Sequence, residues 1–280
     1  MESRPFTFRV KEDQWNLVVR GSGKAFLLLF HGYGQRCEAF KYWEEVLAER
    51  YTFVHVDLAF HGQNASGSFA HSFDAQYAQA WFQAILQCIG AQRVDVLAYS
   101  IGARVAQFVA KHSWKSIGTL ALLAPDGLPV RPGYRFITQT LPGNWLFRAF
   151  VSLPQIALSG IFVAEKLRLI SGKAASFYRF EIANQAKREQ LFNTWMFYRS
   201  CKLSAEELIH LAQHIEGGME VYLGQYDAVL PPKETLRYLQ KQEIPCRTFS
   251  LELGHNLLSE KAVRKWVQTH TNEKSGLGAA

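Results

Sequence analysis

The segment LAYSIGA, residues 97–103, places Ser100 between small residues where an apolar run gives way to a helical pattern. A sharp strand-to-helix turn of this kind can hold a nucleophile, because small residues on either side let the strand and the helix approach closely. Here those small residues are Ala98 and Gly102. Ser100 is therefore a candidate nucleophile if the chain also supplies a base, an acid and an oxyanion site.

Two polar residues later in the chain follow apolar runs and could complete such a site. Asp227 ends the segment GQYD, and His255 ends LELGH. Since parallel strands present their carboxyl ends at one edge of a sheet, we expect both side chains near Ser100. A nucleophilic serine needs a base, and that base needs an acid to hold its tautomer. The order Ser100, Asp227, His255 therefore predicts a catalytic triad.

Each of these assignments has an alternative. Ser100 could belong to an ordinary turn, and His255 could cap the last helix. Asp227 could instead cap the helix that begins near residue 231. Asp126, which directly follows the run LLAP, could serve as the acid from the neighbouring strand.

The loop HGYG, residues 31–34, follows the apolar run AFLLLF and supplies candidates for an oxyanion site. Its glycines permit a turn in which backbone amides point toward a pocket. Preorganised amides of this kind stabilise charge that develops on a carbonyl oxygen. The amides of Tyr33 and Ile101 are the predicted oxyanion donors.

The elements that would position these residues alternate between strand and helix. Alternating runs near the start predict a hairpin, and continuous apolar runs further on predict buried parallel strands. Segments with helical spacing separate them, which predicts an α/β fold with a mostly parallel sheet flanked by helices. Strands are expected at residues 6–10, 14–20, 25–30, 51–57, 93–99, 117–124, 219–224 and 245–251. Helices are expected at residues 37–50, 74–89, 101–112, 203–215, 231–240 and 259–269.

Residues 127–202 interrupt this alternation, because they are rich in aromatics, proline and glycine and show helical patterns without strands. We expect them to form a helical cap inserted after the sixth strand, above the carboxyl edge of the sheet. The core would then comprise residues 1–126 and 203–272. Residues 273–280 would form a disordered tail.

The cap segment is also basic. It contains eleven Lys and Arg residues against three Glu, which gives a charge of +8, while the whole chain carries +7. This excess of positive charge could lie on a solvated outer face, or it could attract an anionic substrate, an acidic carrier or an anionic membrane surface. We expect no nucleic-acid partner and make no prediction of oligomeric state.

Composition favours an ordinary globular protein. The chain of 280 residues is 48% hydrophobic and 20% charged, and its four cysteines are widely spaced. Reduced thiols and the lack of a signal-peptide pattern lead us to expect a cytoplasmic protein. The apolar stretch at residues 149–164 is too short for a membrane span and suggests a broken helical pair covering something apolar.

Taken together, these motifs show that the chain resembles the α/β-hydrolase superfamily, in particular its capped, carboxylesterase-like branch. The resemblance runs from about Phe6 to Val267 and rests on HGYG (31–34), DLAFHG (57–62), AYSIG (98–102), GQYD (224–227) and the pair Gly254-His255. It implies the triad and oxyanion donors given above. It also implies that His31 and His61 are structural, with imidazoles bonded to backbone groups.

The expected reaction is hydrolysis of an ester or thioester with a small-to-medium apolar acyl group, through an acyl-enzyme. No cofactor or metal is expected. The same triad could serve carbon–carbon bond hydrolysis or other cofactor-free chemistry, since the fold does not fix the substrate. A lipid-surface acyl hydrolase that docks through the basic cap and a non-catalytic binding protein are the remaining alternatives.

Overall fold

A computed structural model describes residues 3–67, 69–182 and 184–276. Within them, one twisted sheet contains eight strands in the order β1-β2-β4-β3-β5-β6-β7-β8. The first two junctions, β1 with β2 and β2 with β4, are antiparallel, and all others are parallel. The strands are β1 (Ser3–Val10), β2 (Asp13–Arg20), β3 (Ala25–Phe30), β4 (Tyr51–Val56), β5 (Val94–Tyr99), β6 (Ile117–Leu123), β7 (Met219–Gly224) and β8 (Arg247–Leu251).

The predicted continuous apolar runs form the buried centre of this sheet. All six residues of β4 are buried, and five of the six in β5 are. Strands covered on both faces need apolar side chains in both directions, which explains why these runs do not alternate. The edge strand β1 does alternate, because one of its faces is exposed.

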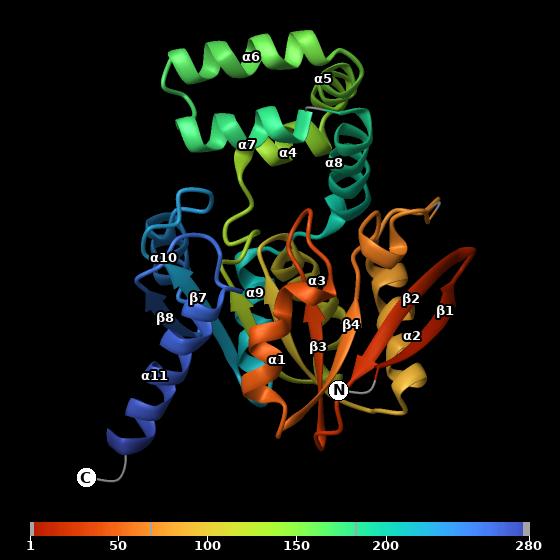
Figure 1. Cartoon of the computed structure of the whole chain (residues 1–280), viewed down its shortest axis with the longest axis vertical. Helices are drawn as coiled ribbons and strands as arrows, with labels where there is room; N and C mark the ends of the chain where they lie inside the picture. The colour runs from red at the N-terminus through yellow and green to blue at the C-terminus, as the bar shows by residue number, and fades with distance from the viewer. Residues whose placement is uncertain (1–2, 68, 183, 277–280) are drawn as a thin grey trace.

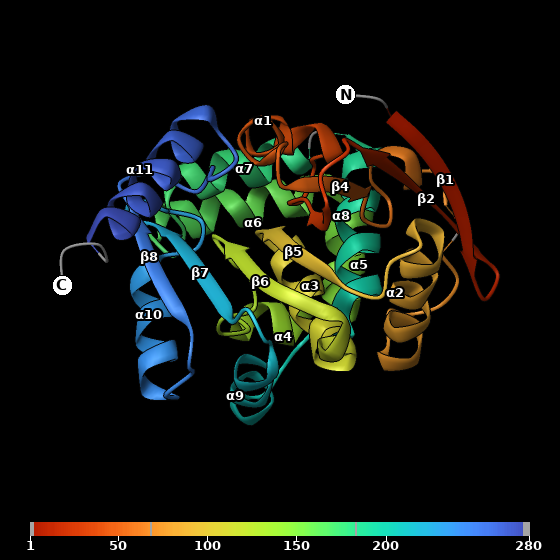
Figure 2. The same ribbon diagram turned by 90° about the horizontal axis from the view of Figure 1, so that it is seen from below.

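Helices cover both faces of the sheet, as Figure 2 shows. On one face, α1 and α11 pack around a cluster that includes Trp43 and Leu257. On the other face, α2, α3, α9 and α10 enclose the larger cluster, which contains Trp81 and Val105. These helices are α1 (Lys41–Leu47), α2 (Ala75–Ile89), α3 (Ile101–Ser113), α9 (Ala205–His214), α10 (Pro232–Lys241) and α11 (Glu260–Gly276). Short 3₁₀ turns are η1 (Cys37–Phe40), η2 (Gly62–Asn64), η3 (Trp114–Ser116) and η4 (Tyr198–Ser200).

Five helices form the cap between β6 and α9, and Figure 1 shows them stacked beyond the carboxyl ends of the strands. These five helices lie where the sequence predicts a helical cap, after the sixth strand. The helices are α4 (Pro132–Gln139), α5 (Leu141–Ser152), α6 (Pro154–Lys166), α7 (Gly172–Ile182) and α8 (Gln185–Phe197). The break between α5 and α6 falls at Leu153, because Pro154 cannot donate the next helical hydrogen bond.

Two expectations need correction. Helix α11 continues to Gly276, so residues 273–276 are helical where a disordered tail was expected, and residues 277–280 lie outside the described part. The pair α5–α6 does not simply cover an apolar surface, since Leu158 and Phe162 of α6 are exposed. Within the described residues, no helix combines the length and apolar character that crossing a membrane requires.

Candidate active site

Ser100 occupies the turn between β5 and α3 in a conformation that few residues adopt. Its φ is 53° and its ψ is −122°, which places a non-glycine residue in a strained region. The turn tolerates this strain because its neighbours are small. A Cβ on Gly102 would lie 2.5 Å from the carbonyl oxygen of Phe30 and 2.4 Å from that of His31. Glycine at position 102 therefore lets α3 approach the end of β3 and fixes the direction of Ser100.

His255 lies beside this serine. Its Nε2 is 3.2 Å from the Ser100 hydroxyl oxygen, which is hydrogen-bond distance. The residue follows β8, and its backbone carbonyl accepts a hydrogen bond of 3.2 Å from the Tyr99 hydroxyl. The loop that carries the imidazole is thus tied to the residue that precedes Ser100.

Asp227 holds the other side of the imidazole. Its Oδ2 lies 2.7 Å from Nδ1 of His255. Its Oδ1 accepts hydrogen bonds of 2.8 Å from the amides of Val229 and Leu230. The carboxylate is buried, and these contacts fix both of its oxygens. An Nδ1–H that donates to Asp227 leaves Nε2 free to accept a proton from Ser100.

Asp126, the alternative acid, has a different partner. Its carboxylate accepts a 2.7 Å hydrogen bond from the guanidinium of Arg104, a side chain that is only 3% exposed. The same guanidinium lies 3.6 Å from the centre of the Tyr134 ring. Asp126 thus neutralises a buried cation at the base of the cap, and the structure brings Asp227 to His255 instead. Asp227 is also not a helix cap, since the residue before α10 is Pro231.

The two predicted oxyanion donors lie at the same edge of the sheet. Ile101 is the first residue of α3, and the first amides of a helix lack partners within it. Tyr33 lies in the loop after β3, the neighbour of β5 in the sheet. That loop turns tightly, because the Gln35 amide donates to the Gly32 carbonyl at 3.3 Å. A stabilising role for the Tyr33 and Ile101 amides remains a prediction.

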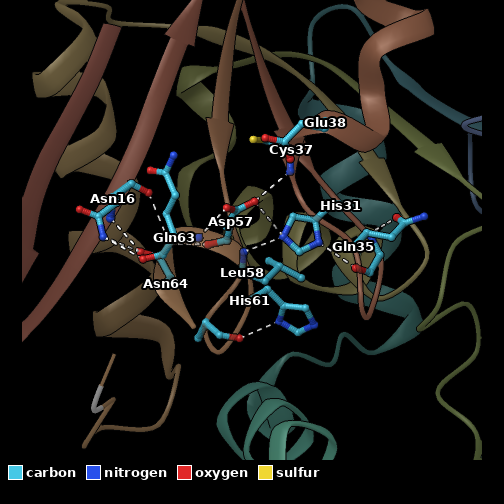
Figure 3. Close-up of polar contacts among 12 residues, drawn as sticks. Asn16, His31, Gln35, Cys37, Glu38, Asp57, Leu58, His61, Gln63 and Asn64 are labelled. Carbon is cyan, nitrogen blue, oxygen red and sulfur yellow. Dashed lines mark hydrogen bonds and ion pairs between the residues drawn. The ribbon is translucent and has the colours of Figure 1, made fainter. Parts of the chain in front are cut away.

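A buried polar network supports this loop from behind (Figure 3). His31 Nδ1 lies 2.7 Å from the Gly32 carbonyl oxygen, and His31 Nε2 accepts the Leu58 amide at 2.9 Å. Nδ1 is therefore the protonated nitrogen and donates to Gly32. Burial lowers the pKa of His31 to about 4, so the ring is neutral at pH 7. The expectation that His31 bonds backbone groups is confirmed.

Asp57, the first residue of the motif DLAFHG, is the second part of this network, and no role was assigned to it from the sequence alone. Its two carboxylate oxygens accept the amides of Cys37 and Gln63, each at 2.9 Å (Figure 3). Burial raises the pKa of this carboxyl. His61 contacts the Ala59 carbonyl through Nδ1 at 2.9 Å, and burial lowers its pKa to about 4. The position of Asp57 directly after β4 was the available signal, because strand ends gather at this edge.

His55 is buried, yet neither ring nitrogen has a hydrogen-bond partner. Oε1 of Glu44 lies 3.3 Å from Nε2 of His55. His55 is therefore a core residue of β4 whose ring nitrogens make no hydrogen bond among the described residues.

Helix α8 of the cap rests on the loops around the candidate site. The Tyr33 hydroxyl donates to the Lys187 carbonyl at 3.4 Å. The side-chain amide of Gln190 donates through Nε2 to the Phe60 carbonyl at 2.7 Å. Just after α8, the Tyr198 hydroxyl accepts the Ala59 amide at 2.9 Å. Sequence reasoning missed these contacts, because no local pattern shows which cap residues face the core.

Across the residues whose placement is described, no group of three or more His, Cys, Asp or Glu could hold a metal ion.

The profile of the alpha/beta hydrolase family matches residues 27–261, which is most of the chain. The chain belongs to this family. Its sheet, flanking helices and helical cap form an α/β-hydrolase fold, and the matched region contains the loop 31–34, Ser100, Asp227 and His255.

Among curated proteins, this α/β hydrolase is similar to an uncharacterized protein of Mycobacterium tuberculosis, with 28% identity over 153 residues. The match covers 53% of this chain and spans less than half, 44%, of that relative. An uncharacterized protein of Mycobacterium bovis matches over the same extent.

Solved structures share the whole architecture. A thermophilic esterase from Thermogutta terrifontis has a TM-score of 0.65 at 16% identity, covering 96% of this chain and 99% of its own. A serine hydrolase from Cycloclasticus zankles has a TM-score of 0.63 at 16% identity and covers all of both chains. An esterase from Exiguobacterium antarcticum has a TM-score of 0.62 at 15% identity, covering 94% of this chain and 96% of its own. At these identities the likeness concerns the fold.

Proposed function

We propose that the protein is a serine hydrolase that cleaves an ester or thioester with a small-to-medium apolar acyl group. One observation carries this proposal: the continuous chain from Asp227 through His255 to Ser100, with separations of 2.7 and 3.2 Å. The strained backbone at Ser100 adds support, because strain concentrates where a side chain must be aimed.

In the first half of the reaction, His255 Nε2 takes the Ser100 proton and the hydroxyl oxygen attacks the substrate carbonyl carbon. Asp227 keeps the imidazole in the required tautomer and stabilises its positive charge. The amides of Tyr33 and Ile101 donate to the oxygen that becomes negative. The tetrahedral intermediate then collapses, His255 returns its proton to the leaving alcohol or thiol, and an acyl-enzyme remains on Ser100.

In the second half, His255 takes a proton from water, and the resulting hydroxide attacks the acyl carbonyl. The acid leaves and Ser100 regains its proton. Each step needs only the imidazole and the two amide donors, so the proposed reaction uses no cofactor or metal.

The preference for an apolar acyl group rests on the aromatic side chains of α8. Phe192 and Trp195 are half-buried and lie 5.0 and 5.6 Å, centre to centre, from the ring of Phe147. The same helix contacts the loop of Tyr33 through the Lys187 carbonyl. We take this aromatic surface, on the cap helix that contacts the loop of Tyr33, to favour an apolar acyl chain.

The test is the initial rate of hydrolysis of 4-nitrophenyl esters of increasing acyl length, with matched acyl thioesters beside them. We expect turnover by the wild-type protein, a maximum at short to medium acyl length, and loss of turnover in Ser100→Ala. Ser113→Ala, at the far end of α3, is the matched control and should retain activity. Folded wild-type protein that cleaves none of these substrates would refute the proposal and favour carbon–carbon bond hydrolysis or a binding role.

A further inference from the structure

The cap exposes an unusual share of the apolar surface. Of the fourteen large hydrophobic side chains exposed in the described part of the chain, eleven belong to the cap. Scattered exposed hydrophobics are normal, but concentrated ones mark an interaction surface. Six of them lie within 17 consecutive residues and define what we call the outer cap face: Leu153, Leu158, Phe162, Val163, Leu167 and Leu169, each 41–74% exposed.

Helix α6 organises this face. Leu158 and Phe162 are four residues apart, so they lie on the same side of the helix, with Val163 next to them. An adjoining side of the helix is packed, since Ile161 of α6 is buried in a small cluster with Ala175 of α7. Figure 1 shows α6 as the helix farthest from the sheet. The exposed side chains of α6 therefore lie at the end of the molecule farthest from the sheet.

The charges beside this face are positive. Lys166 follows Phe162 by one helical turn, Arg168 follows the end of α6, and both are exposed. The nearby Glu165 does not offset them, because it accepts a 2.6 Å hydrogen bond from Arg179. The whole cap segment carries +8 and contains no Asp. An apolar face bordered by unopposed cations is complementary to a surface that is apolar beneath and negatively charged above.

We propose that the outer cap face docks on the interface of an anionic membrane. Leucine and phenylalanine side chains would enter the boundary between headgroups and acyl chains, while Lys166 and Arg168 contact the lipid phosphates. Helix α6 has 13 residues, which suits a helix lying in the interface. The inference rests on the proposed function and deepens it, because docking brings that same serine site to a lipid surface, where esters of apolar acyl groups concentrate.

The docking test uses the full chain carrying Ser100→Ala, so that hydrolysis plays no part. Vesicles of phosphatidylcholine alone, or with about one-third phosphatidylglycerol, are sedimented with the protein at low and high salt. The apolar variant is Leu158→Ser with Phe162→Ser, and its control is Val46→Ser, an exposed residue on α1. The charge variant is Lys166→Gln with Arg168→Gln. Its control is Lys233→Gln with Arg237→Gln, which removes the same charge from exposed positions on α10.

We expect binding to the anionic vesicles that weakens with salt and is far weaker on phosphatidylcholine alone. The apolar variant should lower the partition coefficient at least tenfold, and the charge variant about fivefold for each charge removed. Both control variants should bind like the parent.

Two results would overturn the docking proposal. One is the absence of sedimentation with anionic vesicles, or equal sedimentation of the outer-face variants and their controls. The other is a dimer in analytical ultracentrifugation that Leu158→Ser with Phe162→Ser dissociates, without vesicle binding, which would assign the face to a second copy of the chain. Ester hydrolysis by the wild-type protein is measured separately, so failure of the serine hydrolase and failure of docking are distinguishable.

Discussion

The hydroxyl of Tyr99 donates a hydrogen bond to the backbone carbonyl of His255 across 3.2 Å. Tyr99 precedes Ser100, so this contact joins the strand that carries the candidate nucleophile to the loop that carries the candidate base. The ring also lies against Gly32, where an added Cβ would approach it to 2.8 Å. Burial raises the pKa of Tyr99, which keeps the hydroxyl protonated as a donor. One side chain therefore contacts both the loop at residues 31–34 and the loop that carries the candidate base.

Replacing Tyr99 with Phe tests this positioning. The ring remains against Gly32, but the hydrogen bond to His255, worth about 1 kcal/mol, is lost. We expect kcat to fall by up to about tenfold with little change in KM, because the base is less well placed while substrate contacts remain. Steady-state kinetics on the best ester measure both constants. Unchanged kcat in a folded Tyr99→Phe variant would show that the hydroxyl does not position His255.

The two carboxylates considered for the acid should respond differently to the same change. Asp227→Asn removes the acceptor that sets the His255 tautomer, so we expect kcat to fall about 10³–10⁴-fold. Asp126→Asn should instead lower the free energy of unfolding by about 3 kcal/mol, because the buried Arg104 charge loses its partner. Ester hydrolysis and urea denaturation of both variants separate these effects. Comparable losses of kcat in the two variants would contradict the assignment of Asp227.

Gly102→Ala should disrupt the turn at Ser100. The new Cβ would lie within 2.5 Å of two backbone oxygens of the β3 loop, and neither can move independently of the strand. We expect the free energy of unfolding to fall by about 1–3 kcal/mol and hydrolysis to be nearly lost.

Gly160→Ala in α6 is the control for that variant, since a Cβ there meets nothing within 4 Å. Alanine is the better helix former, so this change should raise stability by up to about 1 kcal/mol and leave hydrolysis unchanged. Full activity in Gly102→Ala, measured beside Gly160→Ala, would show that the close approach of α3 to β3 is not required.

The two neutral histidines near the oxyanion loop predict how stability depends on pH. Burial lowers the pKa of His31 and of His61 from 6.5 to about 4. Between these values the unfolded chain binds protons that the folded chain does not, so the free energy of unfolding falls as pH falls from about 6.5 to 4. Each histidine contributes a slope of about 1.4 kcal/mol per pH unit.

His61→Gln isolates one of these contributions. The free energy of unfolding is measured by urea denaturation at pH 7, 6 and 5. As pH falls, it should decrease less steeply in the variant than in the wild-type protein, and the difference in slope should correspond to the binding of about one proton. The other titrating groups are common to both proteins and cancel in the comparison. Equal slopes would show that His61 is not held neutral by burial.

The sequence predicted the parts of the site that depend on strand ends. Ser100, Asp227 and His255 each follow an apolar run, and parallel strands place such residues at one edge regardless of loop details. The choice between Asp227 and Asp126 could not be made in this way, because both follow strands. The choice depends on the salt bridge between the buried Arg104 and Asp126. These two residues are 22 positions apart in the sequence, and no local pattern reveals their contact.

The same limit explains what else was missed. Asp57 and Gln190 act through backbone groups far away in the chain, and such bonds leave no periodic signal. Residues 273–276 have a polar, small-residue composition that favours fraying, yet they continue α11 as its last turn. The sequence also did not predict which side of each cap helix is buried. Phe162 is exposed and Phe147 is buried, although both lie in similarly apolar segments.

The most direct test of the account is the site of covalent reaction with a fluorophosphonate, which phosphonylates an activated serine oxygen and releases fluoride. Mass spectrometry of the intact protein and of its peptides should find one adduct, on Ser100. It should be absent from Ser100→Ala and form far more slowly in His255→Ala and Asp227→Asn. An adduct on another residue, or ester turnover that persists in Ser100→Ala, would contradict the assignment of Ser100 as the nucleophile.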